Sequence, residues 1–124
     1  MIHITRRERF SSAHKLENKS LSHKENCNIF GACYNVHGHN YELFVTVRGK
    51  VNPKTGFITN LKDLKKLLKK LIISKLDHQV INEVSFMKNK IASTENVCIA
   101  IWEEIYQPIK NELNCELFCV KVLE

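Results

Sequence analysis

The chain has few of the features expected of secreted or membrane proteins. Among its 124 residues no apolar run approaches the ~18 residues of a membrane span. The first ten residues, MIHITRRERF, lack the apolar centre of a signal peptide. The five cysteines are odd in number and form no CxxC pair, which argues against a disulfide framework and against a four-thiolate zinc site. These absences predict a cytoplasmic protein with free thiols and no membrane partner.

Length and charge narrow the possibilities further. A chain of 124 residues predicts a single domain, residues 1–124, with a modest core. The chain has 19 Lys and Arg residues and 13 Asp and Glu residues, a net charge of +6. This charge favours anionic partners. Many of the cations fall in one predicted helix: Lys62, Lys65, Lys66, Lys69 and Lys70. That helix has no aromatic residues to stack on bases, so we expect a solvated face and no nucleic-acid partner.

The apolar periodicity predicts three strands and two helices. Strands are expected over residues 2–14, 39–50 and 115–123, and the middle one alternates clearly. A helix capped by Asn60 carries an apolar stripe of Leu61, Leu64, Leu67, Leu68, Leu71 and Ile72. The intervening residues 15–36 and 76–92 show no regular pattern. This order predicts an α+β fold with an antiparallel sheet.

The second predicted helix begins at Ser93 or Thr94, either of which can cap it. Its buried face is expected to consist of Val97, Ala100, Ile101, Ile105 and Ile109. Pro108 is expected to end or kink this helix, because proline removes a backbone donor.

A candidate metal site lies at the head of the middle strand. His37 and His39 are two residues apart, so on a strand they point to one face at about 6.6 Å separation. A catalytic zinc needs a third protein ligand and an open position. His3, His14, His23 and His78 are the candidates. Spacing favours His14, which ends the first predicted strand.

Two further groups are of chemical interest. Cys33 lies four residues before His37 and is a metal ligand, a reactive thiolate or an inert cysteine. Asp77 and His78 are of the residue types that build a proton relay. Neighbours in an extended segment point opposite ways, however, so these two side chains need not bond each other.

Taken together, the motifs resemble one enzyme family over nearly the whole chain. They are FSSAHKL (10–16), FGAC (30–33), HGHNY (37–41), PKTGFI (53–58), LDH (76–78), STENV (93–97) and VKVLE (120–124). Their order and spacing resemble the 6-pyruvoyltetrahydropterin synthase / 6-carboxytetrahydropterin synthase family. The resemblance implies the tunnelling fold: a four-stranded antiparallel sheet with two helices on one face. It also implies an oligomeric barrel, commonly a homohexamer of two trimers with active sites at subunit interfaces.

The resemblance also implies a role for each motif residue. Zinc would be held by His14, His37 and His39. Cys33 would abstract a proton. Asp77 and His78 would form a relay supplied across a subunit interface, and Glu124 would assist that relay. Glu95 would anchor the pterin ring, with Thr94 nearby.

The implied substrate is 7,8-dihydroneopterin triphosphate. The three residues between Cys33 and His37 resemble the branch that makes 6-carboxytetrahydropterin, with loss of acetaldehyde and triphosphate, on the route to queuosine. We expect that product first and 6-pyruvoyltetrahydropterin as the alternative. A non-catalytic pterin-binding module is a third, less favoured possibility. A folate-pathway branch carries glutamate in place of Cys33, which argues against it here.

Overall fold

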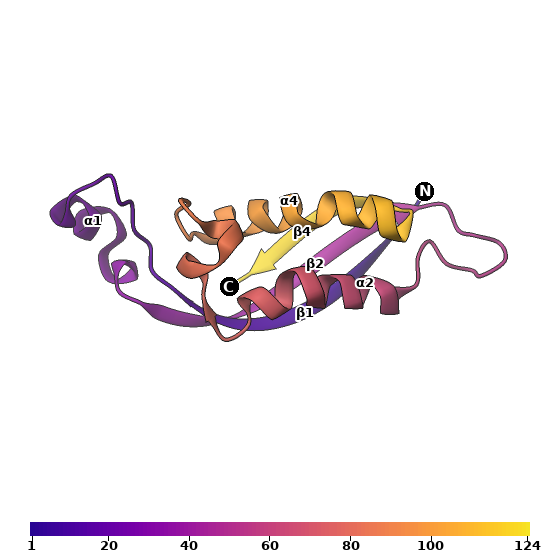
Figure 1. The fold of residues 1–124 in the computed structure, drawn as a ribbon, viewed down its shortest axis with the longest axis horizontal. Helices are drawn as coiled ribbons and strands as arrows, with labels where there is room; N and C mark the ends of the chain where they lie inside the picture. The colour runs from indigo at the N-terminus through magenta and orange to yellow at the C-terminus, as the bar shows by residue number, and fades with distance from the viewer.

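The computed structural model describes all 124 residues and is built around a four-stranded sheet (Figure 1). Strand β1, Ile2–His14, pairs antiparallel with β2, His37–Gly49, along its whole length. Strand β4, Glu116–Leu123, pairs antiparallel with the other edge of β2. Strand β3, Gln79–Val80, lies beside β1, which gives the order β3-β1-β2-β4.

The expectation of a purely antiparallel sheet is wrong at β3. This short strand pairs with Ser12 and Ala13 of β1 in parallel, so the sheet is mixed. A strand of two residues has no measurable periodicity, so the sequence pattern could not reveal it.

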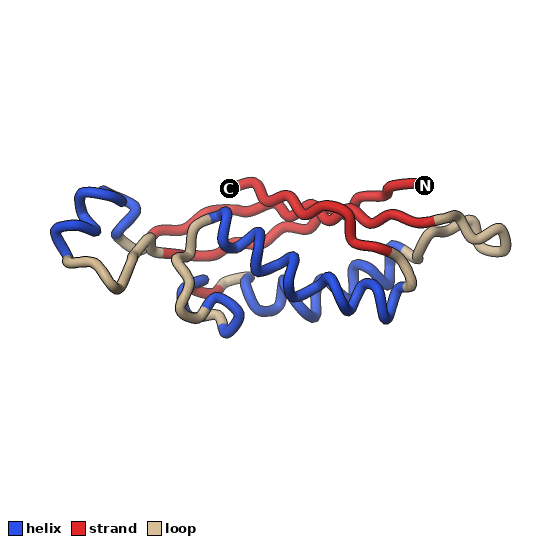
Figure 2. The backbone as a smooth tube through the Cα atoms, turned by 90° about the horizontal axis from the view of Figure 1, so that it is seen from above, coloured by secondary structure: helices blue, strands red, loops and turns tan.

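Two long helical segments cover one face of the sheet, as the family resemblance implied (Figure 2). The first consists of α2, Leu61–Leu68, a π-helical turn Lys69–Ile73, and α3, Ser74–Leu76. The second is α4, Thr94–Leu113. Figure 2 shows the other face of the sheet without a covering layer. No helix in the structure is long and apolar enough to cross a membrane.

The predicted helix starts are confirmed. The Asn60 side chain accepts a hydrogen bond from the Lys62 amide, and Ser93 accepts one from the Asn96 amide. Each bond satisfies an amide at a helix N-terminus that has no intrahelical partner.

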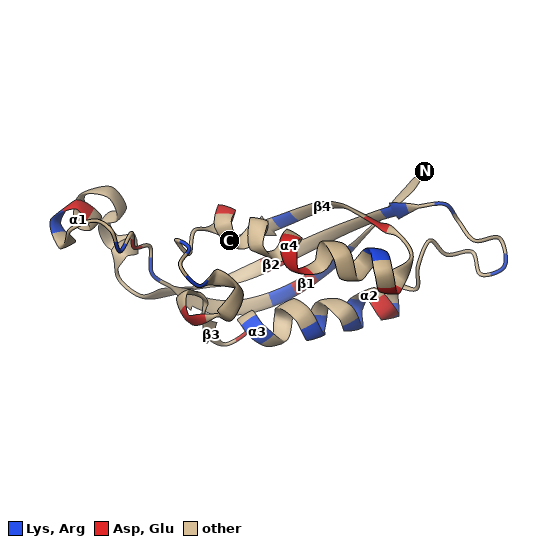
Figure 3. Ribbon diagram, turned by 45° about the horizontal axis from the view of Figure 1, so that its top comes forward, with Lys and Arg blue, Asp and Glu red and all other residues tan.

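The core lies between the sheet and these helices. Alternate residues of β2, from Tyr41 to Val47, are buried against it. The five residues predicted for the inner face of α4, Val97, Ala100, Ile101, Ile105 and Ile109, are all buried. In the α2 segment Leu64, Leu67, Leu68 and Ile72 are buried, whereas Leu61 is 41% exposed. The lysines of that segment are exposed, as predicted, and mark its outer side (Figure 3).

Pro108 does not end α4. The helix continues to Leu113, five residues beyond the proline. Proline removes one helical hydrogen bond, but Ile105 and Ile109 on either side of it are fully buried. We attribute the continuation to that burial, which outweighs the lost bond.

Residues 15–36, which were expected to be irregular, contain α1, His23–Phe30, and a 3-10 turn, Gly31–Tyr34. Ser22 and Glu25 form a reciprocal capping box at the start of α1, a signal that is visible in the sequence. Figure 1 shows this segment projecting from one end of the sheet. Its neck is closed by a 2.8 Å hydrogen bond from the Leu16 amide to the Cys33 carbonyl. We call residues 15–36 the projecting lobe.

Two further 3-10 turns, Ile81–Glu83 and Ser85–Met87, connect β3 to the loop before α4. Asn82 ties the first of them to the end of β1. Its side chain accepts from the Lys15 amide at 2.9 Å and donates to the Lys15 carbonyl at 2.8 Å.

Candidate metal centre and active site

The β1–β2 pairing brings three histidines together. His14 lies directly opposite His37, and His39 follows two residues along β2 on the same face. The ring centroid of His14 lies 4.6 Å from that of His37 and 5.1 Å from that of His39. One ligand nitrogen from each ring lies within 4.8 Å of the others. The convergence predicted for these three side chains is therefore present in the structure.

Hydrogen bonds orient two of the three rings. His14 Nδ1 lies 2.7 Å from the Ala92 carbonyl oxygen, and His37 Nδ1 lies 2.7 Å from the Asn35 carbonyl oxygen. A carbonyl can only accept, so each Nδ1 donates and each Nε2 keeps its lone pair. This is the usual way in which a neighbouring group orients a metal-binding imidazole.

His14 shows most directly that the residues fit a cation. The residue is 2% exposed, and its Nε2 atom is buried without a hydrogen-bond partner. Burial lowers the pKa of His14, and the nearby His37 and His39 lower it further, although the Ala92 carbonyl and Glu124 act in the opposite direction. A neutral ring with a buried free lone pair suits a metal ion such as zinc.

Glu124 and Thr94 border the histidines. Glu124 Oε1 lies 3.6 Å from His14 Nε2 and 3.5 Å from His39 Nε2. Thr94 Oγ1 donates a 3.0 Å hydrogen bond to the same oxygen. The structure thus places Glu124 at the metal centre, in contact with neither Asp77 nor His78. This contact also joins the end of β4 to the first turn of α4.

Tyr41 is a member of this cluster that the sequence did not single out. It is 1% exposed, and its ring lies 5.7 Å from that of His39. Burial raises the pKa of the Tyr41 hydroxyl, and the negative charge of Glu124 raises it further. The sequence contained one sign that Tyr41 belongs to the cluster: it lies two residues after His39, and residues 37, 39 and 41 share a strand face.

Asp77 and His78 form a second group, and their side chains, which sequence reasoning did not require to bond each other, do so in the structure. His78 Nδ1 lies 2.9 Å from Asp77 Oδ2. His78 has a φ of +58°, so the chain is not extended there and the ring turns back to its neighbour. Asp77 Oδ1 also accepts from the Ser11 amide at 2.9 Å. Both bonds lower the pKa of the Asp77 carboxyl, and the bond from the Ser11 amide has the larger effect.

The Asp77–His78 pair is separate from the three histidines. It makes no hydrogen bond or ion pair with His14, His37 or His39, and the His78 side chain is 82% exposed. His78 borders a hollow of about 570 Å³ that also reaches His39 and Asn40. Within one chain the pair is therefore open to a partner that approaches from outside.

The remaining predicted residues, Cys33 and Glu95, are exposed. Cys33 lies in the 3-10 turn of the projecting lobe and is not among the residues whose ligand atoms converge. Glu95 lies in the first turn of α4, directly after Thr94. A single chain thus assembles the candidate metal centre with Thr94 and Glu124 beside it. The thiol, the pterin-anchor candidate and the Asp77–His78 pair lie outside that cluster.

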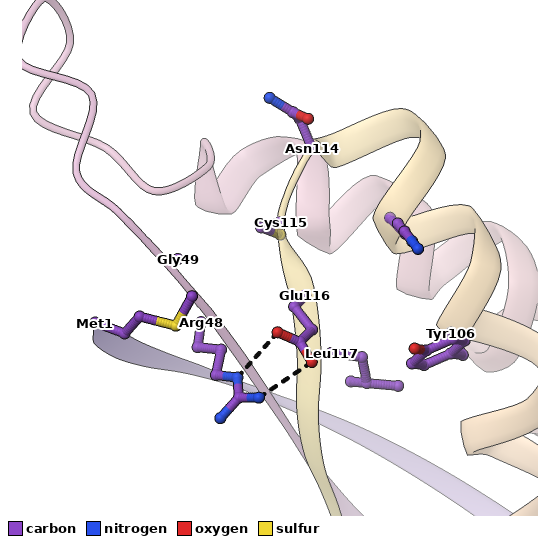
Figure 4. A pocket seen from close by; sticks show the side chains of 9 residues that line it. Met1, Arg48, Gly49, Tyr106, Asn114, Cys115, Glu116 and Leu117 are labelled. Atoms are coloured by element: carbon purple, nitrogen blue, oxygen red, sulfur yellow. Dashed lines mark hydrogen bonds and ion pairs between the residues drawn. The ribbon is translucent and has the colours of Figure 1, made fainter.

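A second hollow, of about 470 Å³, lies near the ends of β2 and α4 (Figure 4). Arg48 and Glu116 form two 3.1 Å hydrogen bonds in its wall. Because β2 has 13 residues, its Gly49 end lies about 40 Å from His37. This hollow is therefore remote from the metal centre and does not contribute to it.

Comparison with known proteins agrees with this geometry. Residues 3–124 match the family model described as 6-pyruvoyl tetrahydropterin synthase. The chain belongs to this family. The 6-pyruvoyl tetrahydropterin synthase fold is also seen in the Caenorhabditis elegans enzyme of that name, whose structure superposes with a TM-score of 0.87 at 34% identity, covering 99% of this chain and 88% of that one. The expected tunnelling fold is thereby confirmed for the single chain.

Among curated relatives, the 6-pyruvoyl tetrahydrobiopterin synthases of Dictyostelium discoideum and Homo sapiens are 42% and 40% identical. Each alignment covers 98% of this chain, and 87% and 83% of the respective relative. A putative 6-carboxy-5,6,7,8-tetrahydropterin synthase of Archaeoglobus fulgidus is 32% identical over 77% of this chain and 69% of its own length. Membership in the 6-pyruvoyl tetrahydropterin synthase family supports a lyase, and the relatives favour the pyruvoyl product over the carboxy product that the Cys33–His37 spacing suggested.

Proposed function

We propose that this chain is a 6-pyruvoyltetrahydropterin synthase, which acts on 7,8-dihydroneopterin triphosphate and eliminates triphosphate. Its support is the near-complete alignment with relatives of that name at 40–42% identity. The three converging histidines, with the free lone pair of His14 among them, are the structural observation that carries the chemistry. The net charge of +6 suits a substrate that bears a triphosphate.

In this proposal His14, His37 and His39 hold zinc. Bound there, zinc would supply a Lewis acid for the hydroxyl groups of the substrate side chain and would stabilise negative charge. The Cys33 thiolate takes the proton that leaves the neighbouring carbon. Glu124 adds a carboxylate beside His14 and His39, where it can accept a hydrogen bond from a substrate hydroxyl.

Glu95 binds the pterin ring in this proposal. The ring has an edge with two parallel N–H donors, and a carboxylate can accept both. Thr94, the preceding residue, is bonded to Glu124, which keeps the first turn of α4 beside the metal centre. Glu95 is exposed in a single chain, so we infer that a neighbouring copy contributes to the enclosure of the ring.

We further propose a homohexamer of two trimers in which Asp77 and His78 serve the site of another copy. The uncovered sheet face and the separation of this pair from the three histidines support that arrangement. A chain of this size also gains by burying more surface. The five free thiols support a reducing compartment, such as the cytoplasm.

The second candidate is 6-carboxytetrahydropterin synthase. One specific observation favours it: only three residues separate Cys33 from His37. Both products belong to the same family and the same proposed substrate, so the site residues alone do not distinguish them.

Product analysis tests the proposal. Purified protein is incubated with 7,8-dihydroneopterin triphosphate, with and without prior chelation, and the pterins are identified by mass spectrometry. We expect the mass of 6-pyruvoyltetrahydropterin, free triphosphate, and loss of turnover after chelation. A carboxypterin with acetaldehyde would establish the second candidate. Pterin binding without any turnover would contradict both and leave a binding module.

A further inference from the structure

The turn that carries Asp77 and His78 has an unusual conformation for its sequence. Helix α3 ends at Leu76 and β3 begins at Gln79, so these two residues make the whole connection. His78 adopts a φ of +58°, a region that non-glycine residues seldom occupy. This conformation brings His78 Nδ1 to 2.9 Å from Asp77. Something in the surrounding structure must therefore hold the turn in place.

Three hydrogen bonds attach this turn to β1. The His78 amide donates to the Ser11 carbonyl at 2.6 Å, and the Ser11 amide donates to Asp77 Oδ1 at 2.9 Å. The third is donated by the Ser12 hydroxyl to the Leu76 carbonyl. The third bond is the only one of the three in which β1 contributes a side chain. Ser11 contributes its backbone amide and carbonyl, and the Ser11 hydroxyl is bonded to Asn40.

We propose that Ser12 is a positioning residue for the Asp77–His78 pair: its hydroxyl holds the end of α3 and thereby keeps His78 in the left-handed conformation that meets Asp77. Ser12 is 5% exposed and Leu76 is fully buried, so this bond is shielded from water. This inference rests on the proposed function only in its effect on activity; the effect on the conformation of His78 does not depend on it.

The cause lies in the backbone of the helix end. The last carbonyls of a helix have no intrahelical partner, and a buried carbonyl left unpaired is unfavourable. Without the Ser12 hydroxyl, the Leu76 carbonyl must move towards water or another donor. Such a movement takes the following two residues with it.

The relaxed state of this turn is an extended one, in which neighbouring side chains diverge. His78 would then leave Asp77, and both bonds that lower the pKa of the Asp77 carboxyl would weaken. The change should stay local. Downstream, the two Asn82–Lys15 hydrogen bonds hold the chain to the end of β1 independently of Ser12.

The test compares Ser12→Ala with Ser12→Thr, which keeps the hydroxyl on a residue suited to a strand. Ser74→Ala is the matched control, because the Ser74 hydroxyl also donates to a helix carbonyl, that of Lys70, at 2.8 Å, but on an exposed residue. The first measurement is the three-bond amide–α-proton coupling of His78, which reports its φ. Zinc content, kcat and KM are measured on the same preparations.

We expect Ser12→Ala to change the His78 coupling and lower kcat about 10- to 100-fold, with zinc content unchanged and KM within about twofold. Ser12→Thr should restore the His78 coupling and kcat to wild-type values, and Ser74→Ala should match wild type. A wild-type coupling in Ser12→Ala, or no rescue by Ser12→Thr, overturns the proposal. If Ser12→Ala does not fold, Ser12→Cys, a weaker donor, is assessed by the same criteria. The coupling measures positioning even if the wild type proves inactive, so failure of the proposed function is distinguishable.

Discussion

His14 is the most constrained residue of the metal centre. Its Nδ1 is fixed by the carbonyl of Ala92, which precedes α4, and its Nε2 is buried without a partner. A buried acceptor without a donor is costly, and a bound cation removes that cost. Zinc bound by these three residues would contribute to folding as well as to chemistry, because it would stabilise whichever state presents all three nitrogens.

Removal of one ligand should therefore release the metal. In His37→Ala, elemental analysis of purified protein should show zinc falling from near one equivalent per chain to a small fraction, since two histidines remain. His23→Ala, in the exposed α1, is the control and should keep its zinc. Full retention of zinc in His37→Ala would contradict the site.

Glu95 allows two interpretations that differ in outcome. As a first-turn acid it would stabilise the α4 dipole by about 0.3–1 kcal/mol. As a pterin anchor, Glu95→Gln should weaken binding of a pterin that lacks the triphosphate by about 2–4 kcal/mol, measured by calorimetric titration. Glu112→Gln, at the other end of α4, should bind as wild type. Unchanged affinity in Glu95→Gln would return the residue to the helix-dipole role.

Cys33→Ala should keep the fold and the zinc but lose about 10²- to 10⁴-fold in kcat, the range for removal of a general base. Cys119→Ala, another exposed thiol, is the control and should retain activity. Thiol labelling provides a second comparison. Burial raises the pKa of the Cys115 thiol, so Cys115 should react much more slowly than Cys33. Wild-type turnover in Cys33→Ala would rule out its role in proton abstraction.

At this scale, strand periodicity was enough to place His37 and His39 on one face. His14 was the best third candidate because it ends the first predicted strand. Sequence reasoning could not find the Ala92 carbonyl, which contacts His14 across 78 positions of sequence. It also left open whether Asp77 and His78 bond each other, because a left-handed conformation at a histidine has no local sequence signal.

At the level of elements, α4 shows how tertiary packing overrides a local signal. Its apolar period predicted the buried face, which is confirmed, and Ser93 or Thr94 was expected to cap its start; Ser93 is the residue that does so. Pro108 was expected to end or kink the helix; the helix does not end there, and Ile105 and Ile109 remain buried on either side. By contrast, β3 and α1 were missed: β3 is too short to show a period, and α1 is a short polar helix marked only by its capping box.

Pro108 should therefore be a site of removable strain. Proline is about 3 kcal/mol less favourable than alanine inside a helix, and its restriction of the unfolded chain offsets about 0.4–1 kcal/mol. We expect Pro108→Ala to raise the free energy of unfolding by about 2 kcal/mol, measured by urea denaturation at a fixed protomer concentration. Pro53→Ala, in the turn between β2 and α2, should give no such gain. A less stable Pro108→Ala would show that the proline fits α4 without cost.

At the level of the whole molecule, the sheet has one covered and one uncovered face (Figure 2). On β4, Phe118 and Leu123 are 48% and 41% exposed. β4 and β3 are the outer strands of the sheet, and outer strands present unpaired backbone groups. These features favour the association of several copies edge to edge, as in the proposed barrel.

Subunit mixing tests that arrangement together with the shared site. His37→Ala lacks a metal ligand and His78→Ala lacks the relay, so each alone should be inactive. Co-expressed, they should form mixed oligomers in which some sites combine intact residues from two copies, and part of the activity should return. Light scattering should give the mass of a hexamer. No recovery in mixed oligomers, or a fully active monomer, would contradict a site shared between subunits.

The projecting lobe has an evolutionary consequence. Cys33 is held by a segment that is fastened at its neck and braced by its own buried Asn26, which bonds to Asn18 and Ser22. The core helices take no part in these contacts, so insertions or deletions between Cys33 and His37 can change the reach of the thiol while the sheet and the histidines keep their register. Relatives can therefore differ in length between these two positions while the strand pairing that brings the three histidines together stays the same.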